Sequence, residues 1–222
     1  MKNQIKGILR FTFSMSLLFI GAGSIRWAGG WLFVLASVVI HSLNYLLLRK
    51  YNPVLIEERG KFKKTDIQKF DKVILAFYLP LQFLFSNLLA GLLYRFHLAH
   101  IPASLAPLGF LLYLASSTPI LWAMASNPHL EPMVRIQNDR EHRVISSGPY
   151  QYVRHPMYLG MILNACTAPL VLGSTCLYLV SAVSVVLIVV RTYLEDSFLE
   201  KQLPGYSAYS QKTKYRIVPF IW

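Results

Sequence analysis

The stretch from residue 157 to residue 190, MYLGMILNACTAPLVLGSTCLYLVSAVSVVLIVV, holds 34 residues and no charged side chain. As a single α-helix it would extend about 50 Å at about 1.5 Å per residue, whereas the hydrocarbon core of a bilayer is about 30 Å thick. The stretch is therefore too long for one ordinary membrane span, and Pro169 and Gly173 mark the place where it breaks. We predict a hairpin of two short helices, Met157–Leu172 and Ser174–Val190.

Four more apolar runs precede this hairpin, each close to or above the about 20 residues that a helix needs to cross the hydrocarbon. They cover Ile8–Ile25, Trp27–Leu48, Val73–Tyr94 and Leu105–Ser126. The composition agrees, since 55% of the 222 residues are hydrophobic and 14% are charged. Backbone groups in lipid must bond within their own segment, which requires helices. The sequence thus predicts an all-α, polytopic membrane helix bundle with about six transmembrane helices, including the C-terminal hairpin, followed by a cytoplasmic tail.

The basic residues test this topology independently, because cytoplasmic loops of membrane proteins are enriched in Lys and Arg. If the amino terminus is cytoplasmic, 20 of the 22 Lys and Arg residues lie on the cytoplasmic side, and only Arg26 and Arg95 lie outside. The carboxyl terminus is then cytoplasmic as well. The net charge of +12 follows mostly from this distribution and favours contact with anionic lipid head groups. A nucleic-acid partner is not expected, because the basic residues are divided among several loops.

Two polar segments outside the membrane are also predicted to contain helices. The connector Arg49–Lys72 carries charges of both signs and is expected to hold a short interfacial helix. After the hairpin, a helix should leave the membrane and end at Pro204-Gly205. A second short helix should follow, with Tyr206 and Tyr209 packing the tail.

The segment SGPYQYVRHPMYLG, residues 147–160, is polar and rich in turn residues although it stands at the entrance of the hairpin. Because the two helices of a hairpin return to the same membrane face, residues 154–155 come close to residues 191–196. Irregular backbone at membrane depth is tolerated where it lines a cavity, which favours a small-molecule site. The sequence has no metal motif, no glycine-rich phosphate loop and no serine nucleophile elbow. The side chains left for chemistry are His142, Arg154, His155, Arg191, Glu195 and Asp196, among several tyrosines.

These side chains suit a zwitterionic, aromatic, cationic ligand, because carboxylates bind an ammonium group, arginines bind a carboxylate and aromatic faces bind a cation. Arg191 and Glu195 are four residues apart, so on a helix they share one face and can reach the same cavity. Simpler interpretations compete with this one. They are a membrane-surface anchor for Arg154, an interfacial ion pair between Arg191 and Glu195, an ordinary loop residue for His142, and interface aromatics for Tyr150 and Tyr158.

The segment 147–160, followed by a hairpin and then by RTYLED at residues 191–196, resembles the membrane methyltransferases related to isoprenylcysteine carboxyl methyltransferase and to the phospholipid N-methyltransferases. The RHPxYxG core of that superfamily matches Arg154, His155, Pro156, Tyr158 and Gly160. Glu195 and Asp196 take the place of its Glu-Glu pair, a conservative departure. The upstream sequence NPHLEPMVRIQNDREHRVISSGPY is similar to the bacterial branch of the family. The resemblance covers about Asn127–Trp222.

This resemblance implies an enzyme that uses S-adenosylmethionine to methylate a lipophilic acceptor, most like the carboxylate of a prenylated cysteine, with membrane lipids as further partners and no metal. Arg191, which would orient the acceptor carboxylate, and Glu195 are the predicted catalytic residues. A single domain over residues 1–222 would contain membrane helices in residues 1–126 and a cofactor-binding catalytic half in residues 127–222. The residues implied in cofactor binding are His142, Gly148, Tyr150, Arg154, His155, Pro156, Tyr158, Gly160, Glu195 and Asp196.

The chemistry would depend on the acceptor. An ionised carboxylate needs no base, so alignment and desolvation would supply the rate. An amine acceptor, as in the phospholipid-type N-methyltransferases, would need Glu195 or a neighbouring group to remove a proton. Two further alternatives are a membrane reductase of the sterol type that uses NADPH, and a non-catalytic membrane scaffold or permease.

Overall fold

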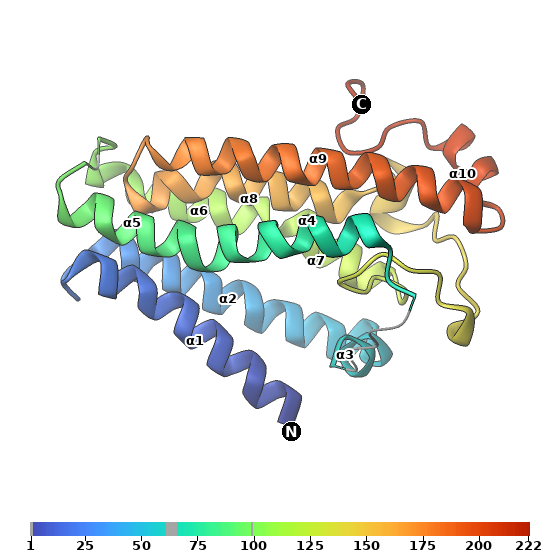
Figure 1. Ribbon diagram of the computed structural model, residues 1–222, viewed down its shortest axis with the longest axis horizontal. Coiled ribbons are helices and arrows are strands. Elements are labelled where there is room, and N and C mark those ends of the chain that lie inside the picture. The colour runs from blue at the N-terminus through green and yellow to red at the C-terminus, as the bar shows by residue number, and fades with distance from the viewer. Residues whose placement is uncertain (1, 61–65, 99) are drawn as a thin grey trace. The chain divides into compact units, whose positions relative to one another are not determined.

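The computed structural model of the protein describes residues 2–60, 66–98 and 100–222 (Figure 1). All regular structure in these ranges is helical, which confirms the predicted all-α fold class. Lys61, Lys63 and Lys64, three of the basic residues that the topology prediction assigns to the cytoplasmic side, lie outside the described residues.

The described residues contain these helices in chain order. Their bounds are α1 Lys2–Ala22, α2 Ala28–Tyr51, α3 Pro53–Gly60, α4 Lys69–Pro80, the π-helix η1 Leu81–Phe85, α5 Ser86–Arg95, η2 Ala103–Leu105, α6 Ala106–Ser116, α7 Thr118–Ser126, η3 Asn138–Arg140, η4 Gly148–Gln151, α8 Pro156–Leu172, α9 Leu177–Gln202 and α10 Tyr206–Lys212. The short helix predicted in the connector forms as α3, and its location at the membrane interface stays a prediction.

Among the described residues, five helical stretches are long and apolar enough to cross a membrane, and they indicate an integral membrane protein. They are Ile5–Ala22, Ala28–Tyr51, Lys69–Arg95, Ala103–Ser126 and Leu177–Gln202. Helix α8 is apolar but has only 17 residues. The total of six crossings and the cytoplasmic location of both termini therefore stay predictions.

The chain divides into two compact units, each made from three segments of the sequence. The first unit comprises Met1–His41, Ala76–Ser116 and Ile162–Val186. The second unit comprises Ser42–Leu75, Ser117–Met161 and Leu187–Trp222. The single domain predicted over residues 1–222 stays a prediction.

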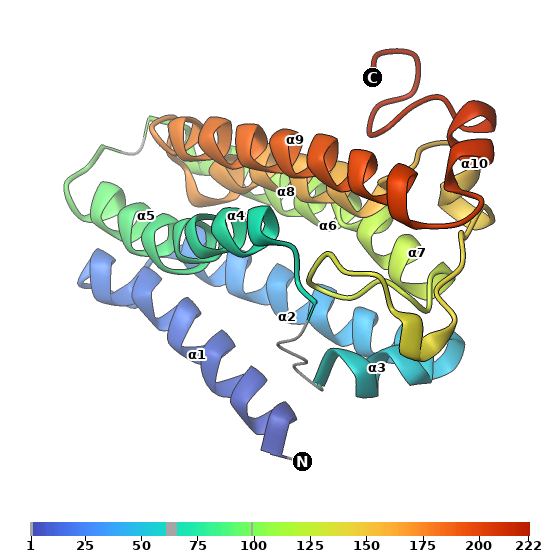
Figure 2. The same cartoon turned by 45° about the vertical axis from the view of Figure 1, so that its right-hand side comes forward.

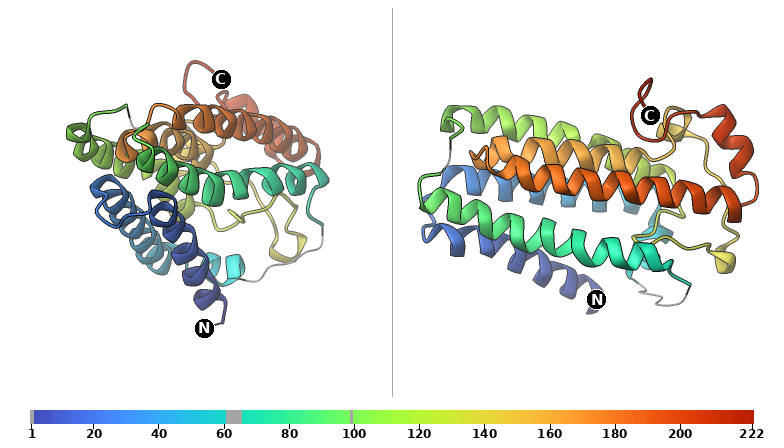
Figure 3. Two further views of the ribbon diagram at one scale, coloured as in Figure 1. Left: turned by 60° about the vertical axis from the view of Figure 1, so that its left-hand side comes forward. Right: turned by 45° about the horizontal axis from the view of Figure 1, so that its top comes forward.

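In the first unit, α1 packs along α5 (Figure 3). A Cβ atom at Gly21 or Gly91 would collide with the backbone of the other helix, so both positions need glycine. Small residues at such positions let membrane helices approach backbone to backbone. Polar side chains reinforce the contact, because Asn87 Nδ2 donates to the carbonyl oxygen of Ser14 at 3.0 Å and Ser14 Oγ donates to that of Phe83 at 2.6 Å.

The helices of the predicted hairpin form, but with other bounds than expected. Gly173 has a φ of +78° directly after α8, as a break requires. Pro169 lies inside α8 and does not break it. Pro169 has no N–H that could donate to the carbonyl of Ala165. That carbonyl instead accepts a hydrogen bond of 2.5 Å from Ser181 Oγ, which replaces the missing helical bond. Helix α9 runs on to Gln202 instead of ending at Val190, so the predicted membrane helix and the predicted exit helix are continuous.

The second unit contains the irregular segment 127–155 and the C-terminal tail after α10 (Figure 2). The tail is held to this segment by backbone hydrogen bonds, from Arg154 N to Tyr215 O at 2.9 Å and from His155 N to Arg216 O at 2.8 Å. The helix α10 forms where it was predicted, after Gly205 with its φ of +84°. A hydrophobic cluster joins Ala123, Tyr150, Leu203, Tyr206 and Tyr209. The RHP segment, Arg154–Pro156, and the end of α9 therefore belong to the same compact unit.

Candidate functional site

A cavity lies within the second unit and encloses about 790 Å³ of empty space, counted to its mouth. That volume is within the roughly 300–1,000 Å³ usual for small-molecule sites. Its walls come from the segment 127–155, the start of α8, the second half of α9, and α10. Eight of the predicted site residues line it: His142, Tyr150, Arg154, His155, Pro156, Tyr158, Arg191 and Glu195.

The remaining predicted site residues, Gly148, Gly160 and Asp196, are not among the residues that line the cavity. Gly148 has a φ of +61°, and a Cβ atom there would approach Ser126 Oγ to 2.6 Å. A Cβ atom at Gly160 would approach the backbone nitrogen of Ile120 to 3.0 Å. Both glycines therefore allow close packing against α7. A direct contact of these three residues with a cofactor stays a prediction.

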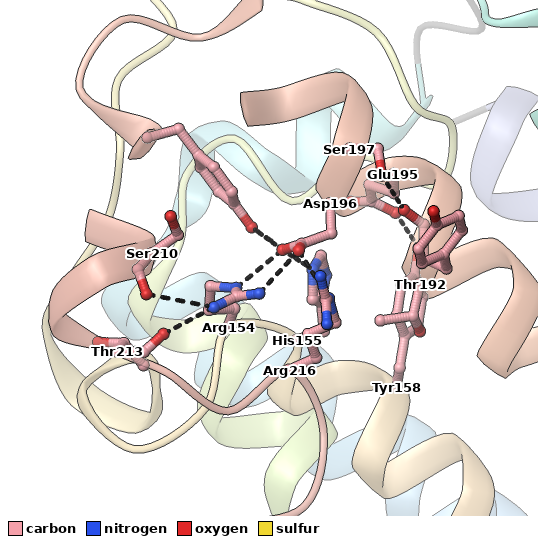
Figure 4. A network of polar contacts seen from close by, with 12 residues as sticks. Arg154, His155, Tyr158, Thr192, Glu195, Asp196, Ser197, Ser210, Thr213 and Arg216 are labelled. Atoms are coloured by element: carbon pink, nitrogen blue, oxygen red, sulfur yellow. Dashed lines mark hydrogen bonds and ion pairs between the residues drawn. The ribbon is translucent and has the colours of Figure 1, made fainter. Parts of the chain in front are cut away.

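Asp196 is the centre of a buried network of charged and aromatic side chains (Figure 4). Its side chain is 3% exposed. It accepts hydrogen bonds from Arg154 Nε at 2.8 Å and Nη2 at 2.7 Å, and from His155 Nε2 at 3.1 Å. Tyr206 Oη and Arg216 Nε also donate to it, at 2.7 and 2.8 Å. Asp196 therefore ties the RHP segment to α9, α10 and the tail.

Arg154 uses its guanidinium group for protein contacts. Besides Asp196, it bonds the carbonyl oxygens of Thr213 at 2.9 Å and Lys214 at 3.1 Å through Nη1. Burial alone would lower the pKa of Arg154, but the hydrogen bonds and the charge of Asp196 raise it above its ordinary value. A charge that is buried and paired in this way fixes the architecture of the site. Arg154 is thus no membrane-surface anchor, since its side chain is 6% exposed.

Arg191 is held by contacts that leave one end of its guanidinium group available. Nε donates to Asp71 Oδ1 at 2.7 Å, and Nη2 donates to the carbonyl oxygen of Pro132 at 2.8 Å. The guanidinium carbon lies 5.3 Å from the centre of the Tyr158 ring, a cation–π distance. Nη1 makes no hydrogen bond to any described residue. Its partner is Asp71 and not Glu195, so the competing idea of an ion pair between Arg191 and Glu195 does not hold.

Glu195 is held in a similar way by Tyr158. The Tyr158 hydroxyl donates a short hydrogen bond to Glu195 Oε2. The ring of Tyr158 stacks on the imidazole of His155, with centres 5.6 Å apart and planes 8° apart. Within the described chain, Glu195 Oε1 has no hydrogen-bond partner. Tyr158 therefore touches Arg191, Glu195 and His155 at once and sets their spacing.

Two histidines of the irregular segment, His129 and His142, are neutral near pH 7, because the pKa of each lies below its ordinary value of 6.5. Burial, together with the nearby His129, Arg135 and Arg140, lowers the pKa of His142 to about 4. Burial also lowers the pKa of His129, whose ring centre is 4.8 Å from that of His142. The buried Gln137 holds this segment together, since its Nε2 donates to the carbonyl oxygen of His129 at 2.6 Å. His142 thus offers the cavity an uncharged aromatic ring.

Sequence reasoning missed several residues of the site. Asp71 is fully buried and accepts hydrogen bonds from Arg191 and from the backbone N of Val134 at 2.9 Å. A carboxylate at the start of an apolar helix is a signal that could have identified it, because such charges usually have a partner and a role. Tyr206 packs in the tail as predicted, but it also lines the cavity. Arg216 gave no signal, because it stands among exposed basic residues of the tail.

The donor set of the cavity fits S-adenosylmethionine. Glu195 can face a sulfonium or ammonium group, and the rings of Tyr158 and Tyr150 can face a cation or an adenine. Arg191 remains available to bind the carboxylate of an acceptor. Within the described ranges, no group of three or more His, Cys, Asp or Glu side chains could hold a metal ion. The absence of a metal cofactor stays a prediction.

Comparison with known families supports this chemistry. Residues 110–201 match the family model of the isoprenylcysteine carboxyl methyltransferase (ICMT) family. The match confirms the resemblance over this range, which contains the cavity-lining parts of α8 and α9, and it indicates a membrane methyltransferase. A search of curated proteins found no match.

Proposed function

We propose that this integral membrane protein transfers a methyl group from S-adenosylmethionine to a lipophilic acceptor, in the first instance the carboxylate of an isoprenylated cysteine. One observation carries the proposal. In a single cavity, within the range that matches the ICMT family, Arg191 Nη1 and Glu195 Oε1 lack a partner among the described residues while the rest of both groups is fixed. Such atoms are available to a ligand.

The cofactor would be held by the tyrosine and acidic side of the cavity. When bound, S-adenosylmethionine supplies a methyl group carried on a positively charged sulfur. Glu195 would stabilise positive charge near it, and the faces of Tyr158 and Tyr150 would add cation–π and stacking contacts. The neutral ring of His142 would favour an aromatic base over a phosphate. Asp196 and Arg154 would act indirectly, because the hydrogen bonds between them fix the positions of the segments that line the cavity.

Arg191 would orient the acceptor. Its Nη1 can bond a carboxylate, while Asp71 and the Pro132 carbonyl prevent the guanidinium group from turning away. A carboxylate acceptor is already ionised and needs no base, so the protein's work is to align it and to exclude water. The stacking of Arg191 on Tyr158 fixes the distance between the acceptor side and the cofactor side of the cavity.

The membrane setting favours a lipophilic acceptor, which can reach the enzyme from the bilayer. We further propose that both termini are cytoplasmic, because 20 of the 22 Lys and Arg residues then lie on that side. This orientation would place the methylated group at the cytoplasmic face. It can be tested by the accessibility of a single added cysteine at either terminus in sealed vesicles.

The function is tested by binding and by methyl transfer with the full chain in detergent. Calorimetry should show binding of S-adenosylmethionine and none of NADPH. Radiolabelled methyl transfer should be detected with a farnesylcysteine analogue, and not with phosphatidylethanolamine, which tests the amine alternative. Arg191→Ala should abolish transfer without loss of cofactor binding, whereas Arg49→Ala, at an exposed position outside the cavity, should be silent. Absence of cofactor binding would overturn the proposal.

A further inference from the structure

A second hollow lies in the first unit and is unlike the site in chemistry. It encloses about 1,040 Å³, counted to its mouth, and is formed by residues of α1, α2, α4 and η1. Most of its surface is apolar, with Phe13, Leu79, Phe83 and Leu84 as the largest side chains. These four side chains are 41–57% exposed, so the hollow is an open groove.

The groove is kept open by a glycine that packing does not require. Gly7 lines it, and a Cβ atom at Gly7 would have no atom within 4 Å. By contrast, Gly21 and Gly91 sit where a Cβ atom would collide with a neighbouring helix. Glycine in the interior of a helix is unfavourable, so its presence in open space calls for another reason. The space that a side chain at Gly7 would fill is the groove itself.

The opposite wall is shaped by the break in helix geometry after Pro80. Proline removes one helical hydrogen bond, and the next five residues, Leu81–Phe85, form a π-helix. Single π turns of this kind are frequent at functional sites. Phe83 and Leu84 reach the groove from this turn.

Among the described residues that line the groove, Arg10 carries a permanent positive charge. Arg10 is exposed, stands within the candidate membrane span Ile5–Ala22, and makes no hydrogen bond or ion pair with any described residue. Lys6 precedes it by four residues, so both lie on one face of α1. A charge within a membrane segment is costly without a counter-charge, and this side of the groove has no described carboxylate among its lining residues.

We propose that the groove is a binding site for an anionic phospholipid. An acyl chain would lie along Phe13, Leu79 and Phe83, and the phosphate would bond the guanidinium group of Arg10, with Lys6 adding charge at the mouth. A mostly apolar groove with an arginine in its lining matches a molecule that has an apolar chain and an anionic head. Arginine suits phosphate, because its planar donors bond two oxygens at once.

The proposal is tested by photocrosslinking the full chain in liposomes. Phosphatidylglycerol and phosphatidylcholine, each with a diazirine in the acyl chain, are compared, and the crosslinked residues are mapped by mass spectrometry. Phosphatidylglycerol should label residues 79–84 about fivefold more than phosphatidylcholine, the preference that one basic residue supports at an anionic membrane surface. Arg10→Gln should remove the preference, while Arg49→Gln, an equal loss of charge outside the groove, should keep it.

Gly7→Leu provides a second variant that keeps Arg10. A Cβ atom at this position meets no other atom within 4 Å, and a leucine side chain there should reduce labelling of residues 79–84 by both lipids. Equal labelling by the two lipids in the parent protein, or labelling that Gly7→Leu does not change, would overturn the proposal. Loss of labelling when a farnesylcysteine analogue is added would also overturn it, because the groove would then hold the acceptor. The result does not depend on methyl transfer and can stand if the proposed function fails.

Discussion

The cavity of the second unit and the groove of the first unit hold their arginines in opposite ways. Arg154 and Arg191 are buried, and each is bound to a carboxylate and to carbonyl oxygens. Arg10 is exposed and bound to no described side chain. Removing one partner of a buried ion pair is costly, whereas an exposed charge can be removed with little effect. The comparison indicates that buried arginines with a carboxylate partner stabilise the fold, whereas an exposed arginine without one is available to bind a ligand.

The largest effect is expected from removing Asp196. Asp196→Ala would leave Arg154 buried without its counter-charge and would free His155, Tyr206 and Arg216 from their common acceptor. We expect a loss of about 3–5 kcal/mol in the free energy of unfolding, measured by chemical denaturation in detergent.

A matched control exists on the same helix. The side chain of Glu200 is exposed and makes no hydrogen bond or ion pair with a described residue, so Glu200→Ala should change the free energy of unfolding by less than about 0.5 kcal/mol. Equal effects of the two variants would show that the Asp196 network is not what stabilises the second unit.

The next effect is expected at Asp71, which holds Arg191 without lining the cavity. Asp71→Asn keeps the size of the side chain and removes the charge that orients the guanidinium group. We expect kcat/KM for the acceptor to fall about 100-fold, the usual cost of a misplaced group, with the Kd for S-adenosylmethionine unchanged. Steady-state kinetics and calorimetry separate the two quantities.

Asp66→Asn serves as the control, because Asp66 is an exposed residue of the preceding loop and its φ of 64° is one that asparagine adopts readily. If Asp71→Asn weakens cofactor binding as much as it lowers kcat/KM, Asp71 does not act through Arg191 alone.

A smaller effect is expected from pH. The pKa of His142 is about 4 in the folded protein against an ordinary value of 6.5. Between these values the unfolded chain binds more protons, so stability is full above pH 6.5 and falls as the pH drops toward 4. We expect a loss of about 1–2 kcal/mol after allowing for solvent screening of the partly exposed ring. Unfolding measured from pH 7 to pH 4 should show a shallower decline in His142→Gln than in the parent protein.

His97→Gln should follow the parent protein across this range, because His97 is exposed in the loop after α5. A decline that His142→Gln leaves unchanged would assign the acid sensitivity to other groups.

The helices and the position of the site could be predicted from the sequence, because both follow from patterns along the chain. An uncharged run of 34 residues must fold back, and that places the RHP segment near residues 191–196. The prediction that the helix breaks at Pro169 was wrong, because Ser181 supplies the hydrogen bond that proline lacks. That bond joins two different helices, so it could not be predicted from the sequence of α8 alone.

The partners of the site residues could not be predicted for the same reason. Asp71 is 120 positions from Arg191 in the sequence, and Arg216 is 20 positions from Asp196. The sequence shows that these charged residues are present, but it does not show which of them form ion pairs. Asp196 accepts five hydrogen bonds from four side chains that lie 10–42 positions away in the sequence, and its contact with a ligand stays a prediction.

The smallest effect is expected at Arg10, and it is the sharpest test of the comparison. In detergent without anionic lipid, Arg10→Gln should change the free energy of unfolding by less than about 0.5 kcal/mol, because no described partner is lost. The same change at Arg154 should cost several times more, because it leaves Asp196 short of two bonds. Added phosphatidylglycerol should stabilise the parent protein and not Arg10→Gln, since a ligand that binds only the folded state raises its stability. A large loss at Arg10 without lipid would mean that this arginine also builds the fold, and the contrast between the two hollows would fail.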